Sequence, residues 1–213
     1  MGRESLQVEE QRIYGLYEQQ RLAGAAACVI GVDEVGRGAV AGPLTVAAVA
    51  LPLEPVILGL DDSKRLTPKR REELAAIIKS VALAIGVAHI EAAAIDRKGM
   101  TASLQQAMLD AIAACQVEPD LVLIDGNPIH IHEKERCIVK GDSKVACIAA
   151  ASIVAKVTRD ALMVVADSEF CGYGFASNKG YASAGHIQAI RERGLCAIHR
   201  TSFCGNFLQQ QLF

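Results

Sequence analysis

Two adjacent carboxylates, Asp33 and Glu34, follow an apolar segment whose composition predicts a buried strand. Acidic side chains at the end of a buried strand are costly to desolvate unless they bind something, and a metal ion is the usual partner. Arg37 comes directly afterwards, between Gly36 and Gly38, whose missing side chains let a ligand approach the backbone amides closely. Carboxylates for a metal beside bare amides and an arginine indicate a phosphate diester as substrate.

Two further aspartates stand at the ends of expected strands. Asp125 closes the apolar segment 120–125, and Asp142 follows the short segment 137–140 just before a long apolar helix. Four carboxylates meeting at one sheet edge would repel one another strongly unless divalent cations neutralised them. Ligation by oxygen alone favours Mg²⁺ or Mn²⁺ over zinc. Two such ions about 4 Å apart can hold the attacking and leaving oxygens of a phosphodiester displacement.

The adjacency of Asp33 and Glu34 sets a geometric condition. Successive side chains of a regular strand point to opposite faces of the sheet. Both carboxylates can serve one metal centre only if the strand ends or bulges there, so we expect an irregular strand at this point. The simpler alternative is that the pair is the solvated end of a hairpin, and only the other two aspartates give the metal interpretation its weight.

Length and composition favour a single domain with a small C-terminal extension: the chain has 213 residues, of which 51% are hydrophobic and 22% charged. No apolar run reaches the roughly 18 residues that indicate a membrane span, and the first 20 residues are too polar for a signal peptide. Seven cysteines without a Cys-x-x-Cys pair predict reduced thiols rather than a zinc site or disulfides. We therefore expect a cytoplasmic protein, with a monomer as the default.

The net charge of −2 hides an uneven distribution of charged side chains. Residues 1–125 hold 12 basic and 17 acidic side chains, whereas residues 126–213 hold 10 basic and 7 acidic ones. Basic residues also cluster at 64–71, 140–144 and 179, and such a patch can bind phosphates on a mildly acidic protein. The alternative is a set of solvated faces, which fits the lysine and arginines at 69–71 equally well.

The order of elements predicts an α/β fold with a mixed sheet and helices on both faces. The expected strands are 28–34, 43–51, 81–90, 120–125 and 137–140. The expected helices are 6–22, 67–80, 92–98, 103–114 and 145–168, with Thr67 as the N-cap of the second and Pro68 at its first position. We expect three units: a helical cap at 1–25, a catalytic domain at 26–168, and a looser helical extension at 169–213 that contributes substrate contacts.

Several sequence blocks are specific in combination and occur in a fixed order. They are Asp-Glu-Val-Gly-Arg-Gly at 33–38, Asp-Asp-Ser-Lys at 61–64, Leu-Ile-Asp-Gly at 123–126, Lys-Gly-Asp-Ser-Lys at 140–144, Ala-Ala-Ala-Ser-Ile-Val-Ala-Lys at 149–156, and the blocks 172–181 and 199–203. Together they resemble bacterial ribonuclease HII, a type 2 ribonuclease H, over roughly residues 26–204. The resemblance implies a ribonuclease H-like fold.

The resemblance also implies an activity and a set of residues. The family cuts RNA paired with DNA and incises on the 5′ side of a single ribonucleotide in duplex DNA, leaving a 3′-hydroxyl and a 5′-phosphate. Gly36, Arg37 and Gly38 would contact the 2′-hydroxyl and the phosphate of that ribonucleotide. Tyr181 would sense its ribose and stack on the following sugar. The implied metal-binding set is Asp33, Glu34, Asp125 and Asp142.

The chemistry of these side chains supports the implied selection of ribose. The 2′-hydroxyl distinguishes RNA from DNA at a given nucleotide, and a glycine-rich turn can bond to it whatever the base. A tyrosine can bond to the same hydroxyl while its ring excludes a misplaced sugar. Phosphate contacts then position the duplex without reading its sequence. The candidates for these contacts are Lys64, Ser143, Lys144 and Lys179.

Other reactive side chains have simpler interpretations. Asp160 falls in the middle of a predicted helix, where a structural ion pair is expected. His130 and His132 have a spacing that could suit a metal, but they occupy a polar loop and are expected to be solvated. His186 and His199 are each expected to be structural, since an isolated histidine usually is.

Three other functions compete with a ribonuclease. A nucleotide-binding protein could cradle phosphate at 36–42, although a strand rather than a helix follows this turn. A non-catalytic nucleic-acid-binding module is disfavoured by four acids that would repel phosphates. A junction resolvase would share the metal centre, and the tyrosine block at 172–181 distinguishes it from the family above.

The last five residues suggest a partner. Gln209 followed by Leu212 and Phe213 resembles the short peptide by which bacterial replication proteins bind the sliding clamp. Such a peptide places two apolar side chains in a hydrophobic pocket while the glutamine anchors its backbone. The favoured alternative is that these apolar residues simply pack a C-terminal helix onto the core.

Overall fold

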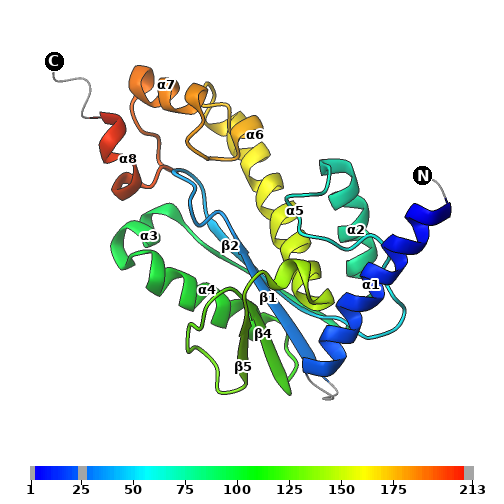
Figure 1. The fold of residues 1–213 in the computed structure, drawn as a ribbon. Helices are drawn as coiled ribbons and strands as arrows, with labels where there is room; N and C mark the ends of the chain where they lie inside the picture. Colours follow the sequence, from blue (N-terminus) through cyan, green and yellow to red (C-terminus); the bar gives the residue numbers. More distant parts are fainter. Residues whose placement is uncertain (1–2, 24–27, 209–213) are drawn as a thin grey trace.

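A five-stranded mixed sheet forms the centre of the computed structural model, which describes residues 3–23 and 28–208 (Figure 1). Its strands lie in the order β3-β2-β1-β4-β5. β2 is antiparallel to both of its neighbours, β1 and β3, whereas β4 runs parallel to β1 and β5 parallel to β4. The strands are β1 (Val29–Val35), β2 (Leu44–Ala50), β3 (Ala84–Ile90), β4 (Leu121–Asp125) and β5 (Glu135–Ile138).

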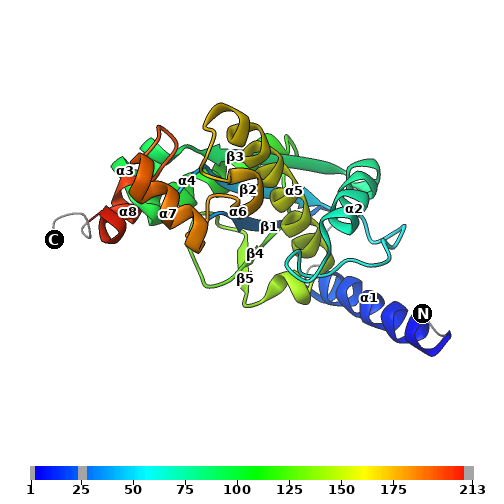
Figure 2. The same cartoon turned by 90° about the horizontal axis from the view of Figure 1, so that it is seen from above.

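Helices cover both faces of this sheet, as the sequence predicts. They are α1 (Arg3–Ala23), α2 (Pro68–Val81), α3 (Ala92–Lys98), α4 (Met100–Ala114), the 3₁₀ turn η1 (Gly141–Ser143), α5 (Ala146–Glu169), α6 (Phe175–Asn178), α7 (Ala184–Arg193) and α8 (Thr201–Leu208). The C-terminal helices gather at the end of the molecule opposite α1 in both views (Figures 1 and 2). Among the described residues, none of these helices is both long and apolar enough to cross a membrane.

Strand alternation divides the core into two layers. Val29 on β1 and Val49 on β2 belong to the layer with α1, α2 and α5, whereas Ile30 and Val32 belong to the layer with α4. Alternate side chains of a strand face opposite sides, so Gly31 and Asp33 share the α5 face. Gly31 lets the backbone of α5 approach β1, because a Cβ there would lie 2.3 Å from the carbonyl carbon of Cys147. The sheet and α5 thus form one closely packed unit that carries Asp33.

Local chemistry explains the start of α2. Thr67 is the N-cap, and its side chain accepts a hydrogen bond from the amide of Arg70, as predicted. Pro68 occupies the first helical turn, where its missing N–H costs nothing. The helix then continues to Val81, so β3 begins at Ala84 rather than at 81.

Other predicted boundaries are wrong. The fifth strand covers Glu135–Ile138 rather than 137–140, and Lys140 adopts a left-handed conformation (φ 57°) that ends the extended chain. The pairing of β1 with β2 continues without a break through Val35. No bulge therefore separates Asp33 from Glu34, and β1 ends at Val35, one residue beyond the pair.

The described part of the C-terminal segment contains an apolar core of its own. Tyr173 and Phe175 stack with ring centroids 5.4 Å apart, and both contact the buried rings of His186 and His199. Hydrophobic contacts among aromatic rings thus build a small separate core at this end. The residues proposed to bind a sliding clamp, Gln209, Leu212 and Phe213, lie outside the described part of the chain.

All seven cysteines are free in the structure. At the other end of the molecule, Gln20 joins α1 to the core. Its Nε2 donates to the carbonyl of Leu51 at 2.8 Å, and its Oε1 accepts from the amide of Cys147 at 2.9 Å. This one side chain therefore links α1 to the ends of both β2 and α5.

Candidate active site

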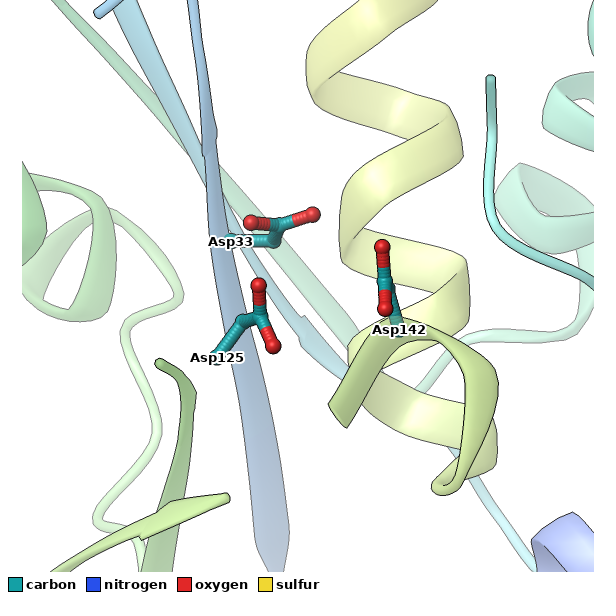
Figure 3. A group of neighbouring side chains, drawn as sticks. All are labelled: Asp33, Asp125 and Asp142. Atoms are coloured by element: carbon teal, nitrogen blue, oxygen red, sulfur yellow. The ribbon is translucent and has the colours of Figure 1, made fainter. Parts of the chain in front are cut away.

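Three aspartates meet in the space between β1 and α5 (Figure 3). Asp33 comes from β1, Asp125 ends the parallel neighbour β4, and Asp142 lies in η1 directly before α5. Each offers one carboxylate oxygen, and these oxygens all lie within 4.8 Å of one another. The prediction that these strand-end acids converge at one sheet edge is confirmed for these three.

The electrostatics of this cluster suit a cation. Burial, together with Glu34 and Asp125, raises the pKa of Asp33 well above its ordinary value. Burial and then Asp125 likewise raise the pKa of Asp142. Partial burial lowers the pKa of Lys64, but Asp62 and then the three carboxylates of the cluster raise it by more. Clustered oxygen donors whose negative charges raise one another's pKa values fit a divalent metal such as Mg²⁺ or Mn²⁺.

Glu34 lies outside the group of three. It keeps its place in the regular ladder opposite Val46, one residue before the end of β1, and it lines the same cavity as Asp33. Burial raises the pKa of Glu34, and its Oε1 lies 3.9 Å from Nη1 of Arg37. The structure therefore brings Glu34 to the edge of the cluster, beside the glycine-rich loop formed by residues 36–43 between β1 and β2.

Hydrogen bonds orient two of the aspartates. Oδ1 of Asp33 accepts from the amide of Glu34 at 2.7 Å, and Oδ1 of Asp125 accepts from the amide of Gly141 at 2.6 Å. The hydroxyl of Ser152 on α5 lines the same cavity as Asp33 and donates to Oγ of Ser63 at 3.0 Å. A backbone amide thus fixes one oxygen of Asp33 from within β1 and one oxygen of Asp125 from η1.

A cavity of about 320 Å³ opens at the cluster. Four residues that the sequence singled out line it, namely Asp33, Glu34, Lys64 and Tyr181. Its lining consists of Asp33, Glu34, Val35, Ser63, Lys64, Ser152, Lys156 and Tyr181. Sequence reasoning missed Ser63, Ser152 and Lys156, although all three lie within the recognised blocks at 61–64 and 149–156.

The glycine-rich loop lies directly against the tyrosine segment. Gly36 takes a positive φ of 89°, which favours glycine, and Arg37 and Gly38 are exposed. The amides of Val40 and Ala41 both donate to the carbonyl of Gly180, at 2.9 and 3.1 Å. Gly180, the residue before Tyr181, is thus hydrogen-bonded to the loop that carries Arg37.

The predicted phosphate contacts differ in their surroundings. Lys64 lines the cavity of the acids. Ser143, Lys144 and Lys179 each donate a side-chain hydrogen bond to a nearby carbonyl, those of Lys140, Val139 and Ala176 respectively. Lys179 lines a second hollow of about 620 Å³ between α2, α5 and α6.

Comparison with known proteins gives this geometry its context. Residues 30–206 match the family model described as ribonuclease HII. The chain belongs to the ribonuclease HII family. It is 48% identical over 178 residues to the ribonuclease HII of Geobacter metallireducens, covering 83% of this chain and 84% of the relative.

Solved structures agree with the family assignment. The ribonuclease HII of Archaeoglobus fulgidus, solved in a complex with PCNA, has a TM-score of 0.74 and 27% identity, covering 86% of this chain and 98% of that one. The Bst ribonuclease HIII in complex with Mn²⁺ has a TM-score of 0.62 and 25% identity, covering 78% of this chain and 63% of that one.

Membership in the ribonuclease HII family makes the chain an endoribonuclease, a hydrolase of a family that depends on divalent metal. This assignment excludes the three alternative functions, namely a nucleotide-binding protein, a non-catalytic nucleic-acid-binding module and a junction resolvase. The mixed sheet flanked by helices is the ribonuclease H-like fold that the motifs implied.

The remaining reactive side chains keep their simpler roles. Asp160 forms ion pairs with Lys156 at 2.8 Å and Arg71 at 3.9 Å, as expected for a structural residue. His130 is exposed in a polar turn, as expected. His186 and His199 are buried, with their Nε2 atoms 3.1 Å apart.

Proposed function

We propose that this chain cuts the RNA strand of RNA–DNA hybrids and incises duplex DNA on the 5′ side of a single embedded ribonucleotide. The products would carry a 3′-hydroxyl and a 5′-phosphate. One observation supports this proposal above the others: a single cavity is lined by Asp33, Glu34 and Tyr181, and the segment of Tyr181 is hydrogen-bonded to the glycine-rich loop. A site for hydrolysis therefore lies beside groups suited to reading a ribose.

Asp33, Glu34, Asp125 and Asp142 would hold two divalent cations, Mg²⁺ or Mn²⁺, in this proposal. When bound, the ions would neutralise charge on the phosphate and supply a nucleophile by lowering the pKa of water. The protein's own contribution is orientation, because the amides of Glu34 and Gly141 hold the carboxylates of Asp33 and Asp125 in place. Glu34 would join from the edge of the cluster, with Arg37 balancing part of its charge.

Ribose selection falls to the loop and the tyrosine. Gly36, Arg37 and Gly38 would contact the 2′-hydroxyl and the phosphate of the ribonucleotide through exposed backbone groups and the guanidinium. Tyr181 is partly exposed at 37%, which leaves its ring available to sense the ribose and to stack on the next sugar. No contact to a base edge is needed, so cleavage should be independent of sequence.

Lys64, Ser143, Lys144 and Lys179 would bind backbone phosphates. Lys144 and Lys179 each already donate to one carbonyl, but an ammonium group has three donors, so both can still bond to a phosphate oxygen. These contacts would position the duplex without reading its sequence.

In this proposal, residues 26–168 supply the chemistry and residues 169–213 add substrate contacts, whereas the cap at 1–25 supports the core. A cytoplasmic location is supported by seven free cysteines, since disulfides are rare in reducing compartments.

A sliding clamp is the proposed partner. The relative from Archaeoglobus fulgidus forms a complex with PCNA, which supports a clamp as partner for this chain. Gln209, Leu212 and Phe213 are the residues that would bind it in this proposal. Deleting Leu212 and Phe213 should abolish binding to a bacterial clamp while the melting temperature stays unchanged. An intact chain that fails to bind the clamp would remove this partner.

The proposed activity is tested with two DNA duplexes that differ only in one 2′-hydroxyl. With Mg²⁺ or Mn²⁺, the duplex carrying one ribonucleotide should be nicked on the 5′ side of that residue, and the all-DNA duplex should stay intact. Labelled ends identify the products. Cleavage of the all-DNA duplex as well as the ribonucleotide-containing one would refute the proposal. So would a failure to cut both the ribonucleotide-containing duplex and a long RNA–DNA hybrid.

A further inference from the structure

Arg159 on α5 is buried in an unusual way. Its side chain is fully inaccessible, yet none of the ion pairs formed by the described residues includes it. A buried charge without a paired carboxylate is costly and is kept only where its hydrogen bonds are well satisfied. The cost indicates that the arrangement around Arg159 serves a purpose beyond filling space.

Among the described residues, the guanidinium of Arg159 donates to three backbone carbonyls, and these belong to two separate segments. Nε donates to Pro43 at 2.8 Å and Nη2 to Ala41 at 3.1 Å, both in the glycine-rich loop. Nη1 donates to Lys179 at 2.8 Å, two residues before Tyr181. The centre of the guanidinium also lies 5.4 Å from the centroid of the Tyr181 ring.

The loop closes tightly over this side chain. A Cβ at Gly36 would lie 2.2 Å from Nε of Arg159, and a Cβ at Gly180 would lie 2.2 Å from the carbonyl oxygen of Ala41. Both glycines have positive φ values, 89° and 80°. The loop, the tyrosine segment and the guanidinium are therefore packed as one unit with no room for side chains between them.

We propose that Arg159 is a positioning residue for ribose recognition: its guanidinium sets the glycine-rich loop and Tyr181 at a fixed separation. This inference rests on the proposed function, in which those two elements read the ribonucleotide. The planar fork of arginine presents several donors in fixed directions, whereas lysine presents a single nitrogen. A lysine at position 159 would keep the charge but could not join both segments in the same geometry.

Arg200 provides a matched control. It is equally buried, and it too donates to backbone carbonyls, from Nε and Nη2 to Gly42 and from Nη1 to Arg37. All of these acceptors lie in the loop, and its guanidinium lies over the ring of Phe203 instead of Tyr181. Arg200 therefore anchors the loop alone, without a bond to the tyrosine segment.

The test is a pair of double-mutant cycles measured as kcat/KM on a duplex with one embedded ribonucleotide. One cycle combines Arg159→Lys with Tyr181→Ala, and the other combines Arg200→Lys with Tyr181→Ala. Arg159→Lys should cost about tenfold or more in the wild-type background and far less when Tyr181 is already alanine. The effects of Arg200→Lys and Tyr181→Ala should multiply, because Arg200 does not act through the tyrosine.

Melting temperature and circular dichroism check that each variant folds. If Arg159→Lys does not fold, Arg159→Gln, which retains a donor without a buried charge, takes its place in the same cycle. Multiplicative effects of Arg159 and Tyr181 would overturn the inference, and so would a Tyr181→Ala variant with normal kcat/KM. If the wild type cuts the substrate but the cycle is multiplicative, the inference alone fails. If the wild type cuts neither this duplex nor a hybrid, the proposed function fails and the inference falls with it.

Discussion

Gly31 is the position where the contact between β1 and α5 can be tested by one methyl group. In a Gly31→Ala variant, the new Cβ would lie 2.3 Å from the carbonyl carbon of Cys147 and 2.5 Å from the amide nitrogen of Ile148. Ordinary contact begins at 3.4 Å, so the two elements must separate by about 1 Å. Both sides of this contact are backbone, so a change of side-chain rotamer cannot relieve it.

The expected loss of stability is at the upper end of the range for an overpacked core, about 3 kcal/mol. For a chain of this length, that corresponds to a fall in melting temperature of roughly 6–12 °C. Activity should suffer separately, because Asp33 lies two residues along the same face and shares its cavity with Ser152 on α5. A displacement of about 1 Å between such groups can cost on the order of 100-fold in rate.

The assay measures thermal unfolding and, at a temperature where the variant is fully folded, the rate of cleavage. Gly15→Ala on the exposed face of α1 is the control, since nothing lies within 4 Å of its Cβ. That variant should keep full activity and gain up to about 1 kcal/mol from the better helix propensity of alanine. A Gly31→Ala variant with the wild-type melting temperature and rate would refute the described packing of β1 against α5.

Three further predictions follow from the site and its surroundings. Asp33→Asn or Asp125→Asn should abolish cleavage while the fold stays intact, and near-normal turnover in Mg²⁺ would remove that residue from the metal centre. Tyr181→Phe should lose part of the activity on an embedded ribonucleotide and Tyr181→Ala more, with binding to all-DNA duplex unchanged; equal activity of both variants would exclude a role for the tyrosine. Burial and the neighbouring His186 lower the pKa of His199 to about 4, whereas an unfolded histidine titrates near 6.5, so the unfolded chain binds more protons between these values. The stability contributed by neutral His199 should therefore be complete above about pH 6.5 and fall by up to about 1.4 kcal/mol per pH unit toward pH 4. The measurement is the difference in unfolding free energy between the wild type and a His199→Gln variant as the pH is lowered. A difference that is constant with pH would contradict this prediction.

The sequence predicts those parts of the fold that depend on local chemistry. The start of α2 follows from the side chain of Thr67 and the ring of Pro68, and both act within one helical turn. The meeting of Asp33 and Asp125 follows from their places at the ends of two apolar strands, because parallel neighbours bring such ends together.

Long-range contacts explain what the sequence could not predict. The course of β1 at Glu34 depends on the partner strand β2, which extends the regular ladder beyond the expected end. The composition of the C-terminal segment, rich in glycine and polar residues, indicates a loose extension. Only the structure shows that its aromatic rings pack in one core.

The burial of Arg159 could not be predicted from the sequence either. A basic residue beside Asp160 in a helix is typical of a solvated surface. Its acceptors, Pro43 and Ala41, lie more than one hundred positions earlier in the chain. No local pattern signals such a contact, so only the folded structure could reveal it.

The central claim is that Asp33, Asp125 and Asp142 form the metal centre at which the strand is cut. The most direct measurement is anomalous X-ray scattering from crystals of the wild type and of an Asp125→Asn variant, both soaked in Mn²⁺. We predict an anomalous peak among the three carboxylates in the wild type and its loss in the variant. A wild-type crystal of an active preparation whose manganese peaks all lie away from these carboxylates would contradict the account.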